Sequence, residues 1–238
     1  MPTDAEIWEN WAKEDPLWGI MAAEDKRGNQ WRLDEFMATG RKDVDEVLAE
    51  IQKTGATLAK DRALDFGCGV GRLTQALARE FARVDGVDQA RGYIQLAERY
   101  NAHQERVFYH VSGTELPFPD EQFNLVLSLI TLHHIPPRQQ LHFLSEFVRV
   151  ARPNGLLVFQ WLGFPLNLRG RLGARLPRLL RLYHNLRYST RQMPSYVVPP
   201  DSVREQLETR GVRVLRLSRE HDHKTYASFN VVAQKLSL

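Results

Sequence analysis

The chain has 238 residues, enough for one sizeable α/β core. Its 32 basic and 29 acidic residues leave a formal net charge of only +3, so the overall balance does not favour a polyanionic partner. The one cysteine, Cys68, excludes an internal disulfide and any mechanism that needs a cysteine pair.

The first ten residues, MPTDAEIWEN, lack the basic and apolar blocks of a signal peptide. The longest apolar stretch near the middle, residues 125–132, is far shorter than the ~20 residues that span a bilayer. We therefore expect a cytoplasmic protein without a transmembrane segment.

The first two stretches of the chain differ in their pattern of apolar residues. Residues 1–60 have a helical pattern and carry four of the five tryptophans, which indicates an N-terminal helical cap. Residues 61–162 alternate short apolar runs with amphipathic segments, as in a parallel sheet built from β-α units. The pattern predicts strands at 62–66, 84–87, 107–111, 124–129 and 156–161, and helices at 72–81, 91–101 and 138–151.

Residues 163–200 interrupt this alternation with an insertion that is rich in arginine and proline and has no acidic residue. Residues 201–238 then predict a helix at 201–210, N-capped by Asp201 or Ser202, and strands at 212–217 and 228–233. A short polar loop joins these last strands, which indicates an antiparallel hairpin at one sheet edge. We expect all four stretches to form one domain, residues 1–238.

The strongest local signal is a glycine-rich segment that runs from a predicted strand into a predicted helix. Gly67, Gly69 and Gly71 stand at alternate positions, where they allow a sharp turn and the close approach of a flat ligand. Arg72 stands where a dinucleotide-binding loop has Gly or Ala. Asp65 disfavours a pyrophosphate but suits a ligand with an ammonium and a sulfonium group. Loop spacing and Asp65 thus argue against an NAD-dependent oxidoreductase.

A second acid, Asp88, follows 23 positions after Asp65, at the tip of the next predicted strand. There its carboxylate can accept hydrogen bonds from both hydroxyls of a ribose. The alternative is that Asp88 only caps the following helix.

Taken together, these motifs resemble those of class I methyltransferases that depend on S-adenosylmethionine (SAM), of the small-molecule, type 11-like kind. The resemblance rests on Asp65-x-Gly67-x-Gly69-x-Gly71, on Asp88, on the stretch LPFPD…FNLV (residues 116–126), on TLHHI (131–135) and on RPNGL (152–156). It covers about residues 60–162 and implies a Rossmann-like, three-layer α/β domain. Its seven-stranded sheet would be mostly parallel, with an antiparallel last strand.

The resemblance also implies a cofactor, SAM, with S-adenosylhomocysteine (SAH) as its product. The expected cofactor-binding residues are Arg41, Asp65, Gly67, Cys68, Gly69, Gly71, Asp88, Gln89, Ser112, Gly113, Thr114 and Ser128. Arg41 would meet the methionine carboxylate, with packing of the cap as the alternative. Ser112 or a nearby backbone group would replace the acid by which the family often contacts adenine.

His134 follows the fourth predicted strand, where the acceptor meets the methyl group in this family. It would serve as a general base for a hydroxyl acceptor, or else only shape the wall. We expect structural roles for His133, His110 and His142. We also expect no metal site, because His221-Asp222-His223 has no further Cys/His cluster with it and fits a hairpin loop.

The sequence therefore predicts methyl transfer by in-line displacement, as O- or N-methylation of a small or medium-sized acceptor. The insertion at 163–200 would form a lid over that acceptor. Its seven arginines favour an anionic or amphipathic molecule, although a membrane surface or a plain solvated face would also explain them. The alternatives are an RNA methyltransferase that uses this insertion for phosphate contacts and a non-catalytic SAM-binding protein. The residues 128–130 do not match the motif for methylating exocyclic amines of nucleic acids, which argues against the first.

Overall fold

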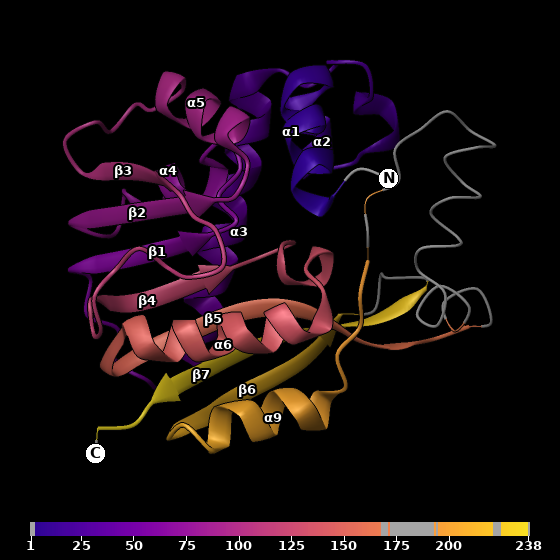
Figure 1. Cartoon of the computed structure of the whole chain (residues 1–238). Coiled ribbons are helices and arrows are strands. Elements are labelled where there is room, and N and C mark those ends of the chain that lie inside the picture. Colours follow the sequence, from indigo (N-terminus) through magenta and orange to yellow (C-terminus); the bar gives the residue numbers. More distant parts are fainter. Residues whose placement is uncertain (1–2, 168–170, 172–192, 194, 221–224, 238) are drawn as a thin grey trace.

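A computed structural model describes residues 3–167, 171, 193, 195–220 and 225–237. These residues form one seven-stranded sheet with the strand order β3-β2-β1-β4-β5-β7-β6 (Figure 1). The strands are β1 (Arg62–Phe66), β2 (Arg83–Asp88), β3 (Val107–Val111), β4 (Phe123–Ser128), β5 (Ala151–Pro165), β6 (Val212–Glu220) and β7 (Tyr226–Lys235). All seven predicted strands are thus present in chain order.

The direction of the strands decides where a site can form. β3, β2, β1, β4 and β5 pair in parallel, whereas β7 runs antiparallel to both of its neighbours, β5 and β6. This confirms the expected mostly parallel sheet with an antiparallel last strand. Because parallel strands end at the same edge, the carboxyl ends of β1, β2, β3 and β4 lie together and carry the loops that follow them.

Helices cover both faces of the sheet and give the three layers. On one face, α6 (Pro137–Val150) and α9 (Pro200–Glu208) contribute Phe143, Phe147 and Leu207 to a core with the apolar side chains of β1, β4 and β5. On the other face, α3 (Leu33–Lys53) and α4 (Arg72–Leu77) contribute Val44 and Leu77 to a second core. The alternation of apolar side chains between the two faces is what a sheet buried on both sides requires.

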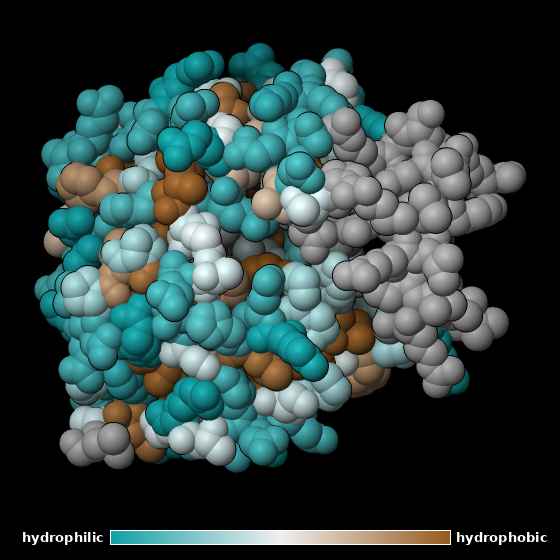
Figure 2. Space-filling view, in the orientation of Figure 1, coloured by the Kyte–Doolittle hydropathy of each residue, from teal (hydrophilic) through white to brown (hydrophobic). Residues whose placement is uncertain are grey.

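The N-terminal helices lie beyond the carboxyl ends of the strands (Figure 1). α1 (Asp4–Glu14), α2 (Pro16–Ile20) and the start of α3 contribute to a third apolar cluster that includes Ile7, Trp11 and Phe36. A short turn, η1 (Glu24–Lys26), lies between α2 and α3 in the chain. Tyr93 of α5 (Arg91–Arg99) belongs to the same cluster, so the cap packs directly on the helix that follows β2. The face in Figure 2 is mainly hydrophilic, with apolar residues in small separate groups.

Several predicted boundaries were wrong. The helix predicted at 72–81 ends at Leu77, and β5 begins at Ala151 rather than at residue 156. The residues between the predicted helix and the predicted strand, 152–155, belong to β5. Asn154 has a positive φ of 62° there, beside a shift in the β4–β5 register. Neither Asp201 nor Ser202 is the N-cap of α9. Pro199 is the N-cap and Pro200 the first helical residue, where proline's missing N–H costs no helical hydrogen bond.

Candidate functional site

The glycine loop connects β1 to α4 and depends on backbone angles that only glycine adopts easily. Gly67, Gly69 and Gly71 have φ values of 76°, 52° and 84°. A Cβ at Gly67 would lie 2.2 Å from the side chain of Thr131, and one at Gly71 would lie 2.1 Å from the hydroxyl of Tyr109. Any side chain at these positions would displace a neighbour, so the loop backbone can lie this close to the rest of the site only with glycine there.

Asp65, the carboxylate just before this loop, is turned toward α4. Its side chain is buried, and Thr74 of α4 donates a hydrogen bond of 2.6 Å to Oδ2. Burial raises the pKa of Asp65 to about 6, against the lowering effect of the Thr74 hydrogen bond. Asp65 therefore braces β1 against α4, and its carboxylate does not line the cavity described below.

Asp88 ends β2 and lies beside the glycine loop. Its Oδ2 accepts a hydrogen bond of 3.0 Å from the backbone N–H of Gly69, and Oδ1 accepts one of 2.9 Å from Ala90. Burial raises the pKa of Asp88 to about 6, although these backbone hydrogen bonds act in the opposite direction. The carboxylate is thus held in one orientation by the loop and by the start of α5.

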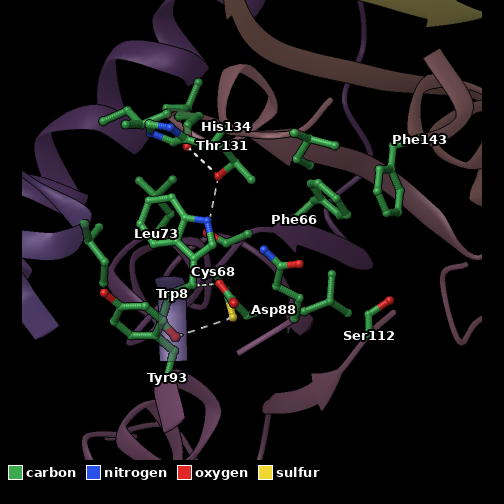
Figure 3. A pocket seen from close by; sticks show the side chains of 18 of the residues that line it. Trp8, Phe66, Cys68, Leu73, Asp88, Tyr93, Ser112, Thr131, His134 and Phe143 are labelled. Carbon is green, nitrogen blue, oxygen red and sulfur yellow. Dashed lines mark hydrogen bonds between the residues drawn. The ribbon is translucent and has the colours of Figure 1, made fainter. Parts of the chain in front are cut away.

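One cavity of ≈ 260 Å³ lies over these groups, between the strand ends and the cap (Figure 3). In that view Ser112 and Phe143 lie toward one end, and Tyr93, Trp8 and His134 toward the other. Nine of the predicted site residues line it: Gly67, Cys68, Gly69, Asp88, Gln89, Ser112, Gly113, Thr114 and His134. They come from four segments far apart in the sequence, which the parallel strand ends bring together.

Four predicted site residues do not line the cavity. They are Arg41, which is exposed on α3, Asp65, which faces α4, Gly71, which is the N-cap of α4, and Ser128, which is fully buried in β4. Gly71 still shapes the loop, because its positive φ starts α4. The other three have no surface on the cavity, so the structure gives them no direct contact with a ligand there.

The sequence analysis also missed lining residues. Trp8 and Ile20 come from the cap, Arg72 follows the glycine motif, and Phe143 comes from α6. The cap as a whole was expected to cover the site, but no pattern singled out these side chains. Arg72 did carry a signal, because it stands where dinucleotide-binding loops have a small residue.

His134 lies in η2 (Leu132–His134), the short turn after β4. Its ring meets the indole of Trp8 edge-on, with centroids 4.9 Å apart. The ring of His133 lies 4.1 Å from that of His134, with the two planes tilted by 51°. The backbone oxygen of His133 accepts a hydrogen bond of 2.7 Å from Tyr196, which ties this turn to the segment that precedes α9. The turn therefore places His134 at the cavity wall, where its ring contacts Trp8 of the cap.

The two other histidines expected to be structural make tertiary hydrogen bonds. His110 lies 2.9 Å from a carboxylate oxygen of Asp85, and His142 lies 2.9 Å from the backbone oxygen of Thr114. Within the described part of the chain, no three His, Cys, Asp or Glu side chains are grouped as metal ligands would be. Residues 221–223 lie outside that part. Of the helices that are described, none is both long and apolar enough to cross a membrane.

Known proteins share this architecture and this loop. A family model described as a methyltransferase domain matches residues 64–159, from β1 to β5. The matched segment is about two fifths of the chain, and it is similar to a methyltransferase domain. Magnesium protoporphyrin IX methyltransferase from Synechocystis PCC 6803, solved with bound SAH, superimposes with a TM-score of 0.64 at 20% identity and covers 98% of this chain and 100% of its own. At that identity the likeness shows the fold of the methyltransferase domain.

Two curated relatives share part of the sequence. The demethylmenaquinone methyltransferase of Tropheryma whipplei is 32% identical over 100 residues, which are 42% of this chain and 41% of that protein. The ubiquinone biosynthesis O-methyltransferase of Coxiella burnetii is 26% identical over 179 residues, 74% of this chain and 73% of that protein. The chain thus matches about two fifths of the length of the first of these relatives.

Proposed function

We propose that this protein transfers a methyl group from SAM to a small or medium-sized acceptor at the cavity over the strand ends. The observation that carries the proposal is that the glycine loop, Asp88 and the Ser112–Thr114 segment all line that one cavity. The resemblance assigned Asp88 to the ribose and the segment around Ser112 to the adenine of the cofactor, and it placed the glycine loop in the same binding site. Their convergence from separate segments supports one ligand that touches all of them.

The residues fit the cofactor. Each oxygen of Asp88 already accepts one backbone hydrogen bond and has a second lone pair for a ribose hydroxyl. Gly67 and Gly69 present bare backbone to the cavity, as a closely bound methionine chain requires. Gln89 and Ser112 would border the adenine. When bound, SAM supplies a methyl group on a sulfonium, which is already an activated leaving group.

The protein would then contribute orientation, exclusion of water and, for a hydroxyl acceptor, a place for the proton. Trp8 and Ile20 of the cap also line the cavity, with Ile20 packed against Gly69, and would keep water away from the reacting groups. Correct orientation alone is worth roughly 7–11 kcal/mol in favourable cases. His134 would accept the acceptor's proton as the new bond to the methyl carbon forms and the carbon–sulfur bond breaks. SAH and the methylated acceptor are then the products.

The acceptor is proposed at the level of its class. The Coxiella relative is named an O-methyltransferase, which supports oxygen as the receiving atom. Most residues of the lid at 163–200, on which an anionic acceptor and the RNA alternative both depend, lie outside the described residues. The remaining alternative is a non-catalytic SAM-binding protein. The methyl-transfer assay described next distinguishes it from an enzyme.

Calorimetric titration with SAM, SAH and NADH is the first test. We expect micromolar binding of SAM and SAH and none of NADH, and failure of both SAM compounds to bind would refute the proposal. Transfer of tritiated methyl to catechol, hydroquinone and 3,4-dihydroxybenzoate then separates an enzyme from a binding protein. With an acceptor in hand, His134→Ala should lower kcat about 100-fold while the SAH affinity stays within a few-fold. His103→Ala, a histidine outside the lining, is the control. An unchanged kcat would leave His134 as part of the wall only.

A further inference from the structure

Arg72 is a buried cation at the cavity. It is the first residue of α4, directly after the glycine loop, and its side chain is only 3% exposed. It also belongs to the cavity lining. Burying a guanidinium is costly unless its charge and its N–H groups are matched, so its position calls for a partner.

Two side chains of α3 partner the guanidinium in part. Nη1 of Arg72 donates to the Thr39 hydroxyl at 3.2 Å and to the carboxylate of Asp43. Gly40, between them, has no side chain, and a Cβ there would lie 2.3 Å from the backbone oxygen of Arg72 and 2.6 Å from its Cγ. The close packing of α3 on Arg72 therefore fixes the guanidinium in place.

The rest of the guanidinium is unmatched. A guanidinium has five N–H groups, and both protein hydrogen bonds engage Nη1. Nε and Nη2 have no partner among the residues that the structure describes. Asp43 is itself 25% exposed, so part of its charge is turned to solvent. A buried, fixed arginine with free donors at a cavity wall suits an anionic group of a ligand.

Arg72 is also the one arginine or lysine among the described lining residues. Arg41, expected from the sequence to meet the methionine carboxylate, is exposed and outside the lining. The structure assigns that carboxylate to Arg72: we propose that Nε and Nη2 of Arg72 bind the carboxylate of SAM and SAH, with Thr39 and Asp43 as positioning residues. This inference rests on the proposed function.

The test uses two ligands that differ only in the carboxylate. SAH carries it, and S-adenosyl-3-thiopropylamine has the same adenosine, sulfur and amine without it. For the natural protein we expect calorimetry to give about 10- to 100-fold tighter binding of SAH, as for a charge-assisted hydrogen-bonded pair. In Arg72→Gln the SAH affinity should fall to that of the amine, whose own affinity should stay within about threefold.

Two further variants sharpen the test. Arg41→Gln is the control and should keep the full preference for SAH. Asp43→Asn removes the ion pair that positions Arg72 but leaves its charge, so the preference should fall by less than in Arg72→Gln, while thermal unfolding reports any loss of stability. If Arg72→Gln keeps the preference, or if both ligands weaken equally, Arg72 has only a structural role and the inference fails while the proposed function stands. Binding of neither ligand to the natural protein would overturn both.

Discussion

The two ends of β2 carry two carboxylates in opposite environments. Asp85, toward the amino end, is fully buried and contacts three cationic or polar side chains: Arg62 at 2.8 Å, Arg83 at 3.1 Å and His110 at 2.9 Å. Asp88, at the carboxyl end, accepts hydrogen bonds from the backbone N–H groups of Gly69 and Ala90, and it faces the cavity. The two residues are three positions apart on one strand.

The difference appears in their acidity. Burial alone would raise the pKa of Asp85, but the hydrogen bonds from His110, Arg62 and Arg83 outweigh it and hold that pKa well below its ordinary value. Asp88 lacks a cationic neighbour of this kind, and burial raises its pKa to about 6. We infer that one end of the strand is organised for stability, whereas the other keeps a carboxylate available for a ligand at the expense of stability.

The largest expected effect is on stability, from Asp85→Asn. The substitution leaves Arg62, only 18% exposed, without its counter-ion, and breaking a buried pair in this way costs about 3–5 kcal/mol. Urea unfolding at pH 7 measures the loss. The SAH affinity of the folded fraction should remain unchanged. A loss below about 1 kcal/mol would show that the two ends of β2 do not differ as argued.

Asp88→Ala should have the converse effect. Loss of two hydrogen bonds between ribose hydroxyls and a carboxylate should weaken SAH binding about 100-fold at pH 8. The free energy of unfolding should change by less than for Asp85→Asn, because no buried cation loses its partner. Calorimetry and urea unfolding on the same preparation measure both quantities. SAH affinity within threefold of the natural protein would contradict the ribose assignment.

A smaller effect is expected from pH. Asp65 and Asp88 have pKa values of about 6 in the folded protein, against 3.8 ordinarily. Between about pH 4 and 6 the folded protein therefore binds more protons than the unfolded chain. The stability that these groups contribute is complete below pH 4 and is lost as the pH rises through 6. The pKa of Asp85 is lowered on folding, so Asp85 adds a slope of the opposite sign that becomes small above pH 5.

The measurement is urea unfolding at pH 5 and at pH 7.5. Relative to Asp88→Asn, the natural protein should lose about 1.4 kcal/mol of stability on going to the higher pH. Its affinity for SAH should change the other way and weaken below pH 6, where Asp88 is protonated. An identical pH dependence in the two proteins would mean that Asp88 is not buried as described.

The smallest effect is expected from His110→Ala. His110 is 33% exposed and gives Asp85 one of several hydrogen bonds, so its loss should cost about 1 kcal/mol. In the Asp85→Asn background the same substitution should cost much less, and the double-mutant cycle measures this coupling. Additive losses would show that the contact of His110 with Asp85 contributes nothing to stability.

The comparison also separates what could be read from the sequence from what could not. Asp88 was predicted because its position depends on local spacing, a fixed number of residues after a glycine loop and at the end of an apolar run. The environment of Asp85 was not predicted. Arg62 comes from β1 and His110 from β3, and their meeting at Asp85 depends on the register of three strands.

The same distinction holds around the cavity. Gly67, Gly69 and Asp88 lie in it as expected, because glycine turns and strand ends follow from the order of residues along the chain. Asp65 faces α4 instead, and Arg72 rather than Arg41 reaches the lining. The burial of Arg72 at the cavity depends on the close packing of α3 on α4 at Gly40. This contact joins segments about 30 residues apart in the sequence.

By itself, the sequence thus determined the strands and their order along the chain, the glycine loop and the resemblance to a methyltransferase domain. These are set by the local periodicity of apolar residues and by backbone angles that glycine alone adopts easily. Only the tertiary structure decided which carboxylate is neutralised, which arginine is buried at the cavity and which cap residues close it. Those outcomes depend on packing between distant segments, where burial and the proximity of charges, rather than residue type, set the energy.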